Sequence, residues 1–415
     1  MDKWKFWTVF ILLMVWGFYP GPAFAVSLQD CKKLSLQNSP LLAAYENLIK
    51  SSIYSYRRDK SSLYGRLNAF YQPDNIQFGD RSDLARKHGF ETRVGSSISW
   101  DLQKILTDFP ALSRLDLTKS RLLESMARNE LIKNVTQNYD RLYVLSMKKK
   151  DYLNILRLFQ GHINEIKKLQ SKGVDVAFDL GRAQIQYRSL TVNLKNINNE
   201  IKDVLFSLNS MMNTSYQESD FSVMDMPDMG LGMPMALNYS TLEESRLDRV
   251  ELESARESFK QSRFYYLPTV QLGMEHNVNT VDPNVEEYRS FLSLNFDIFD
   301  FGQRANEEKR LKYNYEYQKE LFADNQRKLR LKIEQMSHDI KSLRDVYRST
   351  LDNFNNAKSS IETAQNYYRQ GKIKEIDLLG SLSDYLTAAD QSYEALYNFL
   401  SQKAELEAVL KEPRE

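Results

Sequence analysis

The chain has 415 residues with 56 Lys and Arg against 55 Asp and Glu, which gives a formal net charge of +1. This balance excludes the strongly basic surface of a protein whose main partner is nucleic acid. A single cysteine excludes a disulfide framework and any cysteine-based zinc site. The sequence shows no histidine pair at metal-ligand spacing, no nucleophile–base set and no phosphate-binding loop, so we expect no enzyme activity and no cofactor.

Residues 1–25 are predicted to be a secretory signal peptide. Two lysines precede an apolar run, and Ala23-Phe24-Ala25 provides a small-x-small cleavage site. The alternative is a single membrane anchor, but the apolar run of about 13 residues is shorter than a spanning helix needs. Cys31 suggests a second alternative, a lipid anchor. The residues before it lack the small side chains of a lipoprotein signal, so we expect an inert thiol.

Two halves of the sequence share one layout. Gly173 and Gly371 each stand six residues before an aspartate, Asp179 and Asp377, and each pair lies between two long helical stretches. The offset between the halves is roughly 200 residues and is nearly constant for distant features, which indicates a tandem duplication.

We expect residues 26–212 to form the first repeat and 241–415 the second, with a methionine-rich linker at 213–240. In each repeat two strands precede a long helical hairpin, because strict alternation gives way to apolar positions three or four apart. The expected strands cover about 67–78, 89–101, 268–278 and 287–298. The expected hairpins cover 113–212 and 303–411.

The four expected strands have the length of a tilted membrane strand, roughly 9–11 residues. Four strands are too few to close a barrel around a lumen. An open sheet in lipid leaves unpaired backbone groups at both edges. If the strands lie in a membrane, several copies of the chain must therefore share one barrel. The alternative is a helical bundle with a small, half-buried sheet.

Three motifs carry a family resemblance. Phe299-Asp300-Phe301-Gly302-Gln303-Arg304 joins a strand to a long helix, and Tyr368-Arg-Gln-Gly371 with Asp377 forms a helix turn. The segment from Asp179 to Tyr187 repeats this turn in the first half. In this order and at this spacing, the motifs resemble those of the TolC-like outer-membrane efflux proteins, the outer membrane factors. The resemblance covers almost all of the mature sequence.

The resemblance implies a mainly α fold with a membrane β part. This is a tandem-repeat, long α-helical barrel, with four strands that each chain contributes to a trimeric, 12-stranded transmembrane β-barrel. It also implies a homotrimer held in outer-membrane lipid that extends into the periplasm. Its function would be that of a passive duct of a tripartite efflux or type I secretion system, opened by a periplasmic adaptor (membrane fusion) protein and an inner-membrane pump. The alternative is a secreted periplasmic coiled-coil scaffold or adaptor without a membrane barrel.

The resemblance further implies a gate at the periplasmic tip. The matching positions are Gly173, Asp179, Tyr368, Gly371 and Asp377. In the family, acidic, tyrosine and arginine side chains close the channel there, and a ring of carboxylates favours cations. The alternative role for the two aspartates is to cap the helix that follows each of them.

Two departures leave the gate chemistry open. Ile373 stands where the family often has a gate arginine, and Gly380 stands where a second acidic residue can occur. At the strand-to-helix junction the matching residues are Asp300, Gly302 and Arg304. The resemblance implies no catalytic, cofactor or metal site, and it names neither the cargo nor the pump.

Seven methionines crowd into the end of the first repeat and the linker. They are Met211, Met212, Met224, Met226, Met229, Met233 and Met235. Thioether groups suit Cu(I), so one hypothesis is a soft-metal site. We favour the alternative, a flexible apolar strap that packs on the helices.

Overall fold

The computed structural model describes residues 26–75, 90–172, 176–221, 227, 229–230, 238–266, 268–279, 286–295 and 299–411. The predicted signal peptide, Gly173 and four of the linker methionines (Met224, Met226, Met233 and Met235) lie outside the described residues. Among the described helices, none has a stretch apolar and long enough to cross a membrane.

The chain divides into two compact units, and each unit combines parts of both sequence repeats. Unit 1 contains Met1–Pro40, Ala127–Leu237 and Leu331–Lys411. Unit 2 contains Leu41–Met126, Asn238–Arg330 and Glu412–Glu415. The long helices α5 (Ala111–Ser171) and α8 (Gln303–Arg369) begin in unit 2 and end in unit 1. The compact units therefore do not coincide with the predicted repeats.

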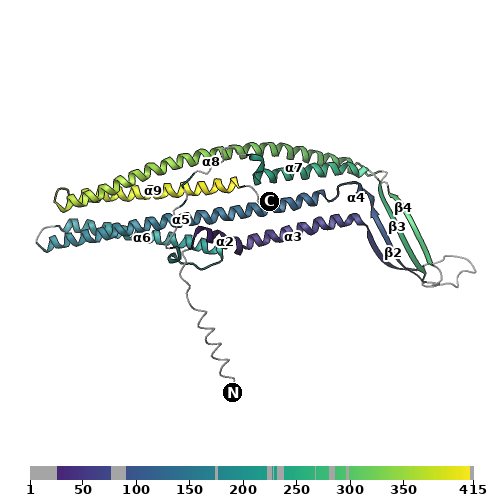
Figure 1. The fold of residues 1–415 in the computed structure, drawn as a ribbon, viewed down its shortest axis with the longest axis horizontal. Helices are drawn as coiled ribbons and strands as arrows, with labels where there is room; N and C mark the ends of the chain where they lie inside the picture. Colours follow the sequence, from purple (N-terminus) through teal and green to yellow (C-terminus); the bar gives the residue numbers. More distant parts are fainter. Residues whose placement is uncertain are drawn as a thin grey trace, which may run out of the picture. The chain divides into compact units, whose positions relative to one another are not determined.

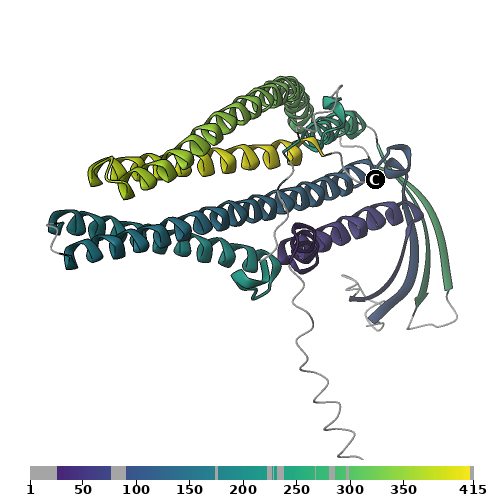
Figure 2. The same ribbon diagram turned by 60° about the vertical axis from the view of Figure 1, so that its left-hand side comes forward.

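Unit 1 is built from two helical hairpins, in which α5 lies beside α6 (Ala177–Met212) and α8 beside α9 (Glu375–Leu410), as Figures 1 and 2 show. α6 buries Ala183, Leu190 and Ile197, which recur every seventh residue on one face. A short helix, α2 (Leu28–Asn38), contacts α6. Apolar faces of this kind, rather than helix propensity, account for most of the stability of long helices in water.

The turn of the second hairpin depends on Gly371. Its φ is +70°. The Gly371 N–H donates to the carbonyl of Tyr368 at 2.8 Å, and the Lys372 N–H donates to that of Tyr367 at 2.9 Å. This pattern is a Schellman motif, which ends a helix with a residue in the left-handed region. The glycine that the sequence pattern singles out therefore has a conformational role.

Polar contacts join α5 of the first repeat to α9 of the second along unit 1. Gln137 Nε2 donates to Ser401 Oγ at 2.9 Å, and Tyr152 donates to Asp390 at 3.0 Å. Nearer the hairpin turns, His162 contacts Glu375 at 2.8 Å. We call this row of contacts the α5–α9 seam. It holds the two hairpins together.

Unit 2 contains a four-stranded antiparallel sheet in the order β1-β2-β3-β4. The strands are β1 (Arg66–Asn75), β2 (Phe90–Asp101), β3 (Thr269–Asn279) and β4 (Glu286–Asn295). β2 and β3 pair across the two repeats, so the sheet is continuous. The outer edges of β1 and β4 pair with no other strand among the described residues.

Short helical segments lead into and out of the sheet. α3 (Pro40–Ser61) and the 3-10 turn η2 (Ser62–Tyr64) precede β1, and α4 (Leu102–Leu106) follows β2. The corresponding elements in the second half are α7 (Glu243–Ser262) and η5 (Arg263–Tyr266), which precede β3. Two further 3-10 turns, η3 (Glu218–Phe221) and η4 (Tyr239–Thr241), lie between the repeats. The predicted fold class, mainly helical with one four-stranded sheet, is confirmed.

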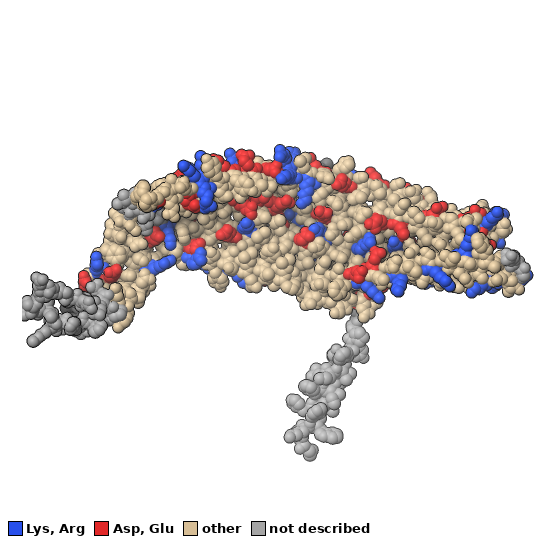
Figure 3. Space-filling model, turned by 180° about the vertical axis from the view of Figure 1, so that it is seen from behind, with Lys and Arg blue, Asp and Glu red and all other residues tan. Residues whose placement is uncertain are grey.

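The helices carry both signs of charge. Lys and Arg side chains are interspersed with Asp and Glu over the helices on the face that Figure 3 displays. Many of the ion pairs join residues three or four apart on one helix, such as Arg310 with Glu307 and Lys328 with Asp324. Exposed pairs of this kind contribute little to stability. They are typical of a solvated helical surface.

Candidate functional site

The ends of both helical hairpins of unit 1 bring a polar cluster together. His162 near the end of α5 and Glu375 at the start of α9 are both buried, with side chains 7% and 2% exposed. Their Nε2 and Oε2 atoms are 2.8 Å apart. An acidic side chain in the first turn of a helix is stabilised by the helix dipole. The pair thus joins the first repeat to the second at the hairpin turns.

Tyr368 at the end of α8 packs on this pair. Its ring lies edge-on to the His162 imidazole, with the ring centroids 4.7 Å apart. Burial and the nearby carboxylates of Glu375 and Asp179 raise the pKa of Tyr368 to about 12. The phenol therefore stays protonated near neutral pH. Asp179 and Tyr368, which the sequence predicts at the tip, lie close enough to interact electrostatically.

A small apolar core lies next to this cluster, between α5 and α6. Ile163, Ile166 and Ala183 are buried, and Val176, Leu180 and Tyr187 pack against them. These residues join the end of α5 to the start of α6. The sequence prediction used Tyr187 only as a marker of the repeat, whereas the structure places it in this core.

The two predicted gate aspartates have different surroundings. Asp377 is exposed in the first turn of α9, and its carboxylate accepts the backbone N–H of Lys374 at 3.0 Å. Asp179 lies in the first turn of α6, where the N-cap residue Val176 makes no side-chain cap. The sequence predicted that both aspartates lie just ahead of a helix, but both lie inside the first turn of their helices. The capping role is present at Asp377 alone of the two.

The arginine missing at position 373 has a counterpart one turn earlier. Arg369 Nε lies 3.2 Å from a carboxylate oxygen of Glu165, so α8 and α5 are joined by an ion pair. Ile373 is partly buried in the turn, and Gly380 is exposed on α9. The tip therefore has a tyrosine, an arginine and several carboxylates, although not all at the predicted positions.

Sequence reasoning placed Glu375 beside the predicted gate but missed His162 and the contact between the two. They are 213 residues apart in the sequence, and His162 has no motif around it. A weak signal was present, because Phe159, His162, Ile163 and Ile166 share the buried face of α5 at helical spacing. A histidine on such a face requires a partner once it is buried.

The strand-to-helix junction after β4 is a helix cap. Asp300 Oδ1 accepts the N–H of Gly302 and Oδ2 accepts the N–H of Arg304, both at 3.0 Å. Gly302 has φ +82° and Phe301 φ +54°, so the backbone passes through the left-handed region twice. The predicted junction residues Asp300, Gly302 and Arg304 thus begin α8. The tight turn leaves the ring of Phe301 89% exposed.

Exposed aromatic and large apolar side chains occur at every described strand end that meets a helical segment. They are Tyr64, Ile105, Leu106, Tyr265, Tyr266, Phe299 and Phe301. Side chains of this kind are enriched where membrane proteins cross the lipid–water interface.

The sheet of unit 2 has one apolar and one polar face. The apolar face carries side chains that are between 42% and 75% exposed: Leu67, Tyr71, Val94, Leu272, Met274, Tyr288, Leu292 and Leu294. The polar face includes the cross-strand row Asn68, Ser97, Glu275 and Arg289. An exposed apolar face of this extent marks an interaction surface.

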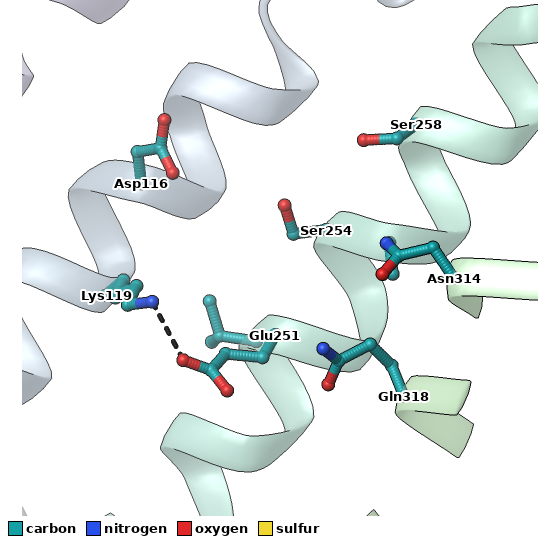
Figure 4. Close-up of a pocket in the computed structure, with 9 residues that line it drawn as sticks. Asp116, Lys119, Glu251, Ser254, Ser258, Asn314 and Gln318 are labelled. Atoms are coloured by element: carbon teal, nitrogen blue, oxygen red, sulfur yellow. Dashed lines mark hydrogen bonds and ion pairs between the residues drawn. The ribbon is translucent and has the colours of Figure 1, made fainter. Parts of the chain in front are cut away.

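Unit 2 also contains a polar cavity of about 290 Å³ between α5, α7 and α8, drawn in Figure 4. Lys119 Nζ and Glu251 Oε1 form an ion pair across it at 2.8 Å. Serine and amide side chains, among them Ser254 and Asn314, complete the lining. Among the described residues, no group of three or more His, Cys, Asp or Glu is arranged to hold a metal ion.

Cys31 and Met212 are buried in the helical unit. Cys31 is fully buried in α2, and burial raises the pKa of its thiol to about 12. Little reactive thiolate forms near neutral pH under these conditions. Met212 is buried at the end of α6. The soft-metal hypothesis depends largely on methionines outside the described residues.

Comparison with known proteins identifies relatives over most of the chain. Residues 246–410 match the family model described as outer membrane efflux protein. The outer membrane protein TolC of Escherichia coli is 18% identical over 426 residues, which cover 91% of this chain and 84% of TolC.

Solved structures share the fold. The crystal structure of CusC has a TM-score of 0.82 at 13% identity and covers 93% of this chain and 92% of that one. The outer membrane channel CmeC of Campylobacter jejuni has a TM-score of 0.81 at 14% identity, with 94% and 87% covered. VceC of Vibrio cholerae has a TM-score of 0.78 at 14% identity, with 92% and 94% covered. In the sequence of residues 246–410 and in the fold of the described residues, the chain is thus similar to outer membrane efflux proteins.

Proposed function

We propose that this protein is the outer-membrane duct of an export system, a passive channel formed by three copies of the chain. A periplasmic adaptor and an inner-membrane pump would open it and supply the energy. In this proposal residues 1–25 direct export, and the tandem repeats 26–212 and 241–415 each supply two strands and one helical hairpin. The observation that carries the proposal is the exposed apolar face of the sheet.

That face is what a lipid-facing sheet requires. In a half-buried sheet, helices would cover the apolar side chains, as the alternative of a periplasmic scaffold demands. Here Leu67, Met274 and Leu292 are all more than half exposed. The other face of the sheet carries the polar row Asn68, Ser97, Glu275 and Arg289. Apolar and polar faces of this kind are typical of strands between lipid and a watery lumen. The scaffold alternative is therefore not favoured.

The unpaired outer edges of β1 and β4 support an oligomer. Each unpaired backbone group at an open sheet edge costs several kcal/mol in hydrocarbon. This cost strongly favours closing the sheet into a barrel. Pairing β4 of one copy with β1 of the next satisfies both edges in the same way at every interface. With four strands from each copy, three copies supply the twelve strands expected from the family.

The hairpin turns of unit 1 supply the proposed gate. Asp179, Tyr368, Gly371 and Asp377, with Gly173 outside the described residues, mark the tip at which the three copies would converge. The buried cluster of His162, Tyr368 and Glu375 would set the position of each hairpin. The Glu165–Arg369 ion pair would add a second link between hairpins.

Membrane fractionation and conductance test the proposal. We expect the mature protein in the outer-membrane fraction, extractable only with detergent, with a protein mass of three chains by light scattering. Reconstituted into a planar lipid bilayer, it should conduct ions. A folded monomer in detergent-free buffer would contradict the proposal, because the exposed apolar face and open edges would then need no partner.

A further inference from the structure

We propose that His162 and Glu375 form a proton-controlled clasp between the two helical hairpins of one chain, which tightens on acidification. One consequence rests on the proposed channel function: the clasp favours the closed tip of the channel at acidic pH. The clasp itself is a property of the single chain and can be measured independently of conduction.

The geometry places the pair where movement of a hairpin must break it. His162 belongs to α5 and Glu375 to α9, and the direct contact between their side chains is almost fully removed from solvent. Phe159 and Tyr368 pack edge-on against the imidazole, with centroids at 5.8 and 4.7 Å. Separating the start of α9 from α5 would expose both polar groups to water.

The Glu375 carboxylate is buried between His162 and Tyr368. Oε2 contacts His162, Oε1 has no hydrogen bond of good geometry among the described residues, and the Tyr368 phenol interacts with the same carboxylate. A buried carboxylate that is not fully hydrogen-bonded is destabilised unless a charge compensates it. A proton added to the imidazole supplies that charge and turns the contact into an ion pair.

Carboxylates surround the Tyr368 ring that packs on the imidazole. Glu165 of α5, Asp179 of α6 and Glu375 of α9 act on the Tyr368 phenol, and Arg369 of α8 is paired with Glu165. Tyr368 stays neutral, since burial and these carboxylates raise its pKa to about 12. Carboxylates near a histidine favour its charged form.

The direction of the pH effect on the clasp follows from these charges. With a neutral imidazole, the clasp is a hydrogen bond between His162 and a buried carboxylate. With a protonated imidazole it is a buried ion pair, and opening must separate opposite charges. One linked proton changes the opening equilibrium by up to about tenfold per pH unit. Acidification therefore holds the hairpins together.

Two measurements on the full-length oligomer test the clasp. The first is the open probability in a planar lipid bilayer at about pH 7.5 and about pH 5.5, the range over which histidine charges. The second is amide hydrogen exchange at the start of α9, corrected for the intrinsic pH dependence of exchange. The variants are His162→Gln, which keeps an N–H donor but cannot take up a proton, and Glu375→Gln. His338→Gln is the matched control, because His338 is 84% exposed on α8.

For the native protein and His338→Gln, we expect a severalfold lower open probability and stronger protection of α9 at the acidic pH. Both effects should be lost in His162→Gln and in Glu375→Gln, and the second variant guards against a folding defect peculiar to the first. A pH response of α9 in His162→Gln equal to that of the native protein would overturn the clasp, as would a native protein without any response. A native protein that shows the exchange response but never conducts would refute the channel and leave the clasp intact.

Discussion

Tyr152 on α5 donates its hydroxyl to both carboxylate oxygens of Asp390 on α9, at 3.0 and 3.1 Å. One residue earlier on α5, Asp151 accepts the hydroxyl of Tyr393 on α9. The two repeats therefore exchange a tyrosine and an aspartate in both directions across the α5–α9 seam. Lys148 adds an ion pair to Asp390 at 2.9 Å.

This exchange predicts that Tyr152→Phe destabilises the helical part of the protein. The substitution removes one donor from a partly buried carboxylate, and hydrogen bonds to charged groups contribute about 1.5 kcal/mol or more. The unfolding midpoint of the purified protein, followed by far-UV circular dichroism, should fall. Tyr317→Phe is the control, because Tyr317 is an exposed tyrosine on α8. Equal unfolding midpoints for the two variants would show that the Tyr152 hydroxyl does not contribute to the stability of the α5–α9 seam.

The two faces of the sheet predict opposite tolerance for charge. Met274 and Ser97 lie on adjacent cross-strand rows, Met274 on the apolar face and Ser97 on the polar one. Arginine at a lipid-facing position near mid-membrane costs about 2–4 kcal/mol. We therefore expect Met274→Arg to reduce assembly into the outer membrane strongly, and Ser97→Arg, which would lie beside Glu275, to assemble normally. Heat-modifiable migration of outer-membrane extracts on gels measures the folded fraction, and similar yields for both variants would argue against lipid contact.

The second hairpin predicts opposite effects for two alanine substitutions. Gly371 has φ +70°, so Gly371→Ala should cost about 1–2 kcal/mol through backbone strain. Gly380 lies inside α9 with no atom within 4 Å of an added Cβ. Gly380→Ala should therefore stabilise the protein by about 0.5–1 kcal/mol, because alanine is the better helix former. Unfolding midpoints that move in the same direction for both variants would contradict the left-handed turn.

A buried acid predicts a pH dependence of stability separate from the clasp. Asp140 on α5 is 5% exposed, and burial raises the pKa of its carboxyl to about 7, although Lys32 and Lys403 oppose the shift. Between the ordinary pKa of an aspartate and about 7, the folded state keeps a proton that the unfolded state has lost. Stability should therefore fall as the pH rises through this window, by at most about 1.4 kcal/mol per pH unit for one proton.

Asp140→Asn removes that proton and should flatten the dependence. The measurement is the unfolding midpoint of both proteins at intervals across the window. The informative quantity is the difference between the native and variant curves, because the contributions of all other titrating groups cancel in it. A difference that does not change with pH would show that Asp140 titrates like an exposed aspartate.

Local patterns were sufficient to predict most of the elements. The helical spacing of apolar residues predicted a long helical hairpin at 303–411, and the structure has α8 at Gln303–Arg369 and α9 at Glu375–Leu410. Strict alternation predicted strands near 67–78 and 268–278, where β1 covers Arg66–Asn75 and β3 covers Thr269–Asn279. These patterns are visible because neighbours in sequence share one helix face or one side of a strand.

The tip shows where such reasoning ends. Tyr368 and Asp179 were predicted there because they lie in recognisable turn motifs. The pairing of His162 with Glu375 was not predictable, because His162 carries no motif and is ordinary within its own helix. Only the packing of α5 against α9 makes them partners.

By itself, the sequence determined the long helices and the alternating strands, because each of these depends on residues close together in the chain. Only the tertiary structure decided that the apolar face of the sheet stays exposed and that Asp300 caps α8. It also decided which polar groups meet across the α5–α9 seam. Contacts between residues hundreds of positions apart depend on how helix faces pack, and no local pattern records that packing.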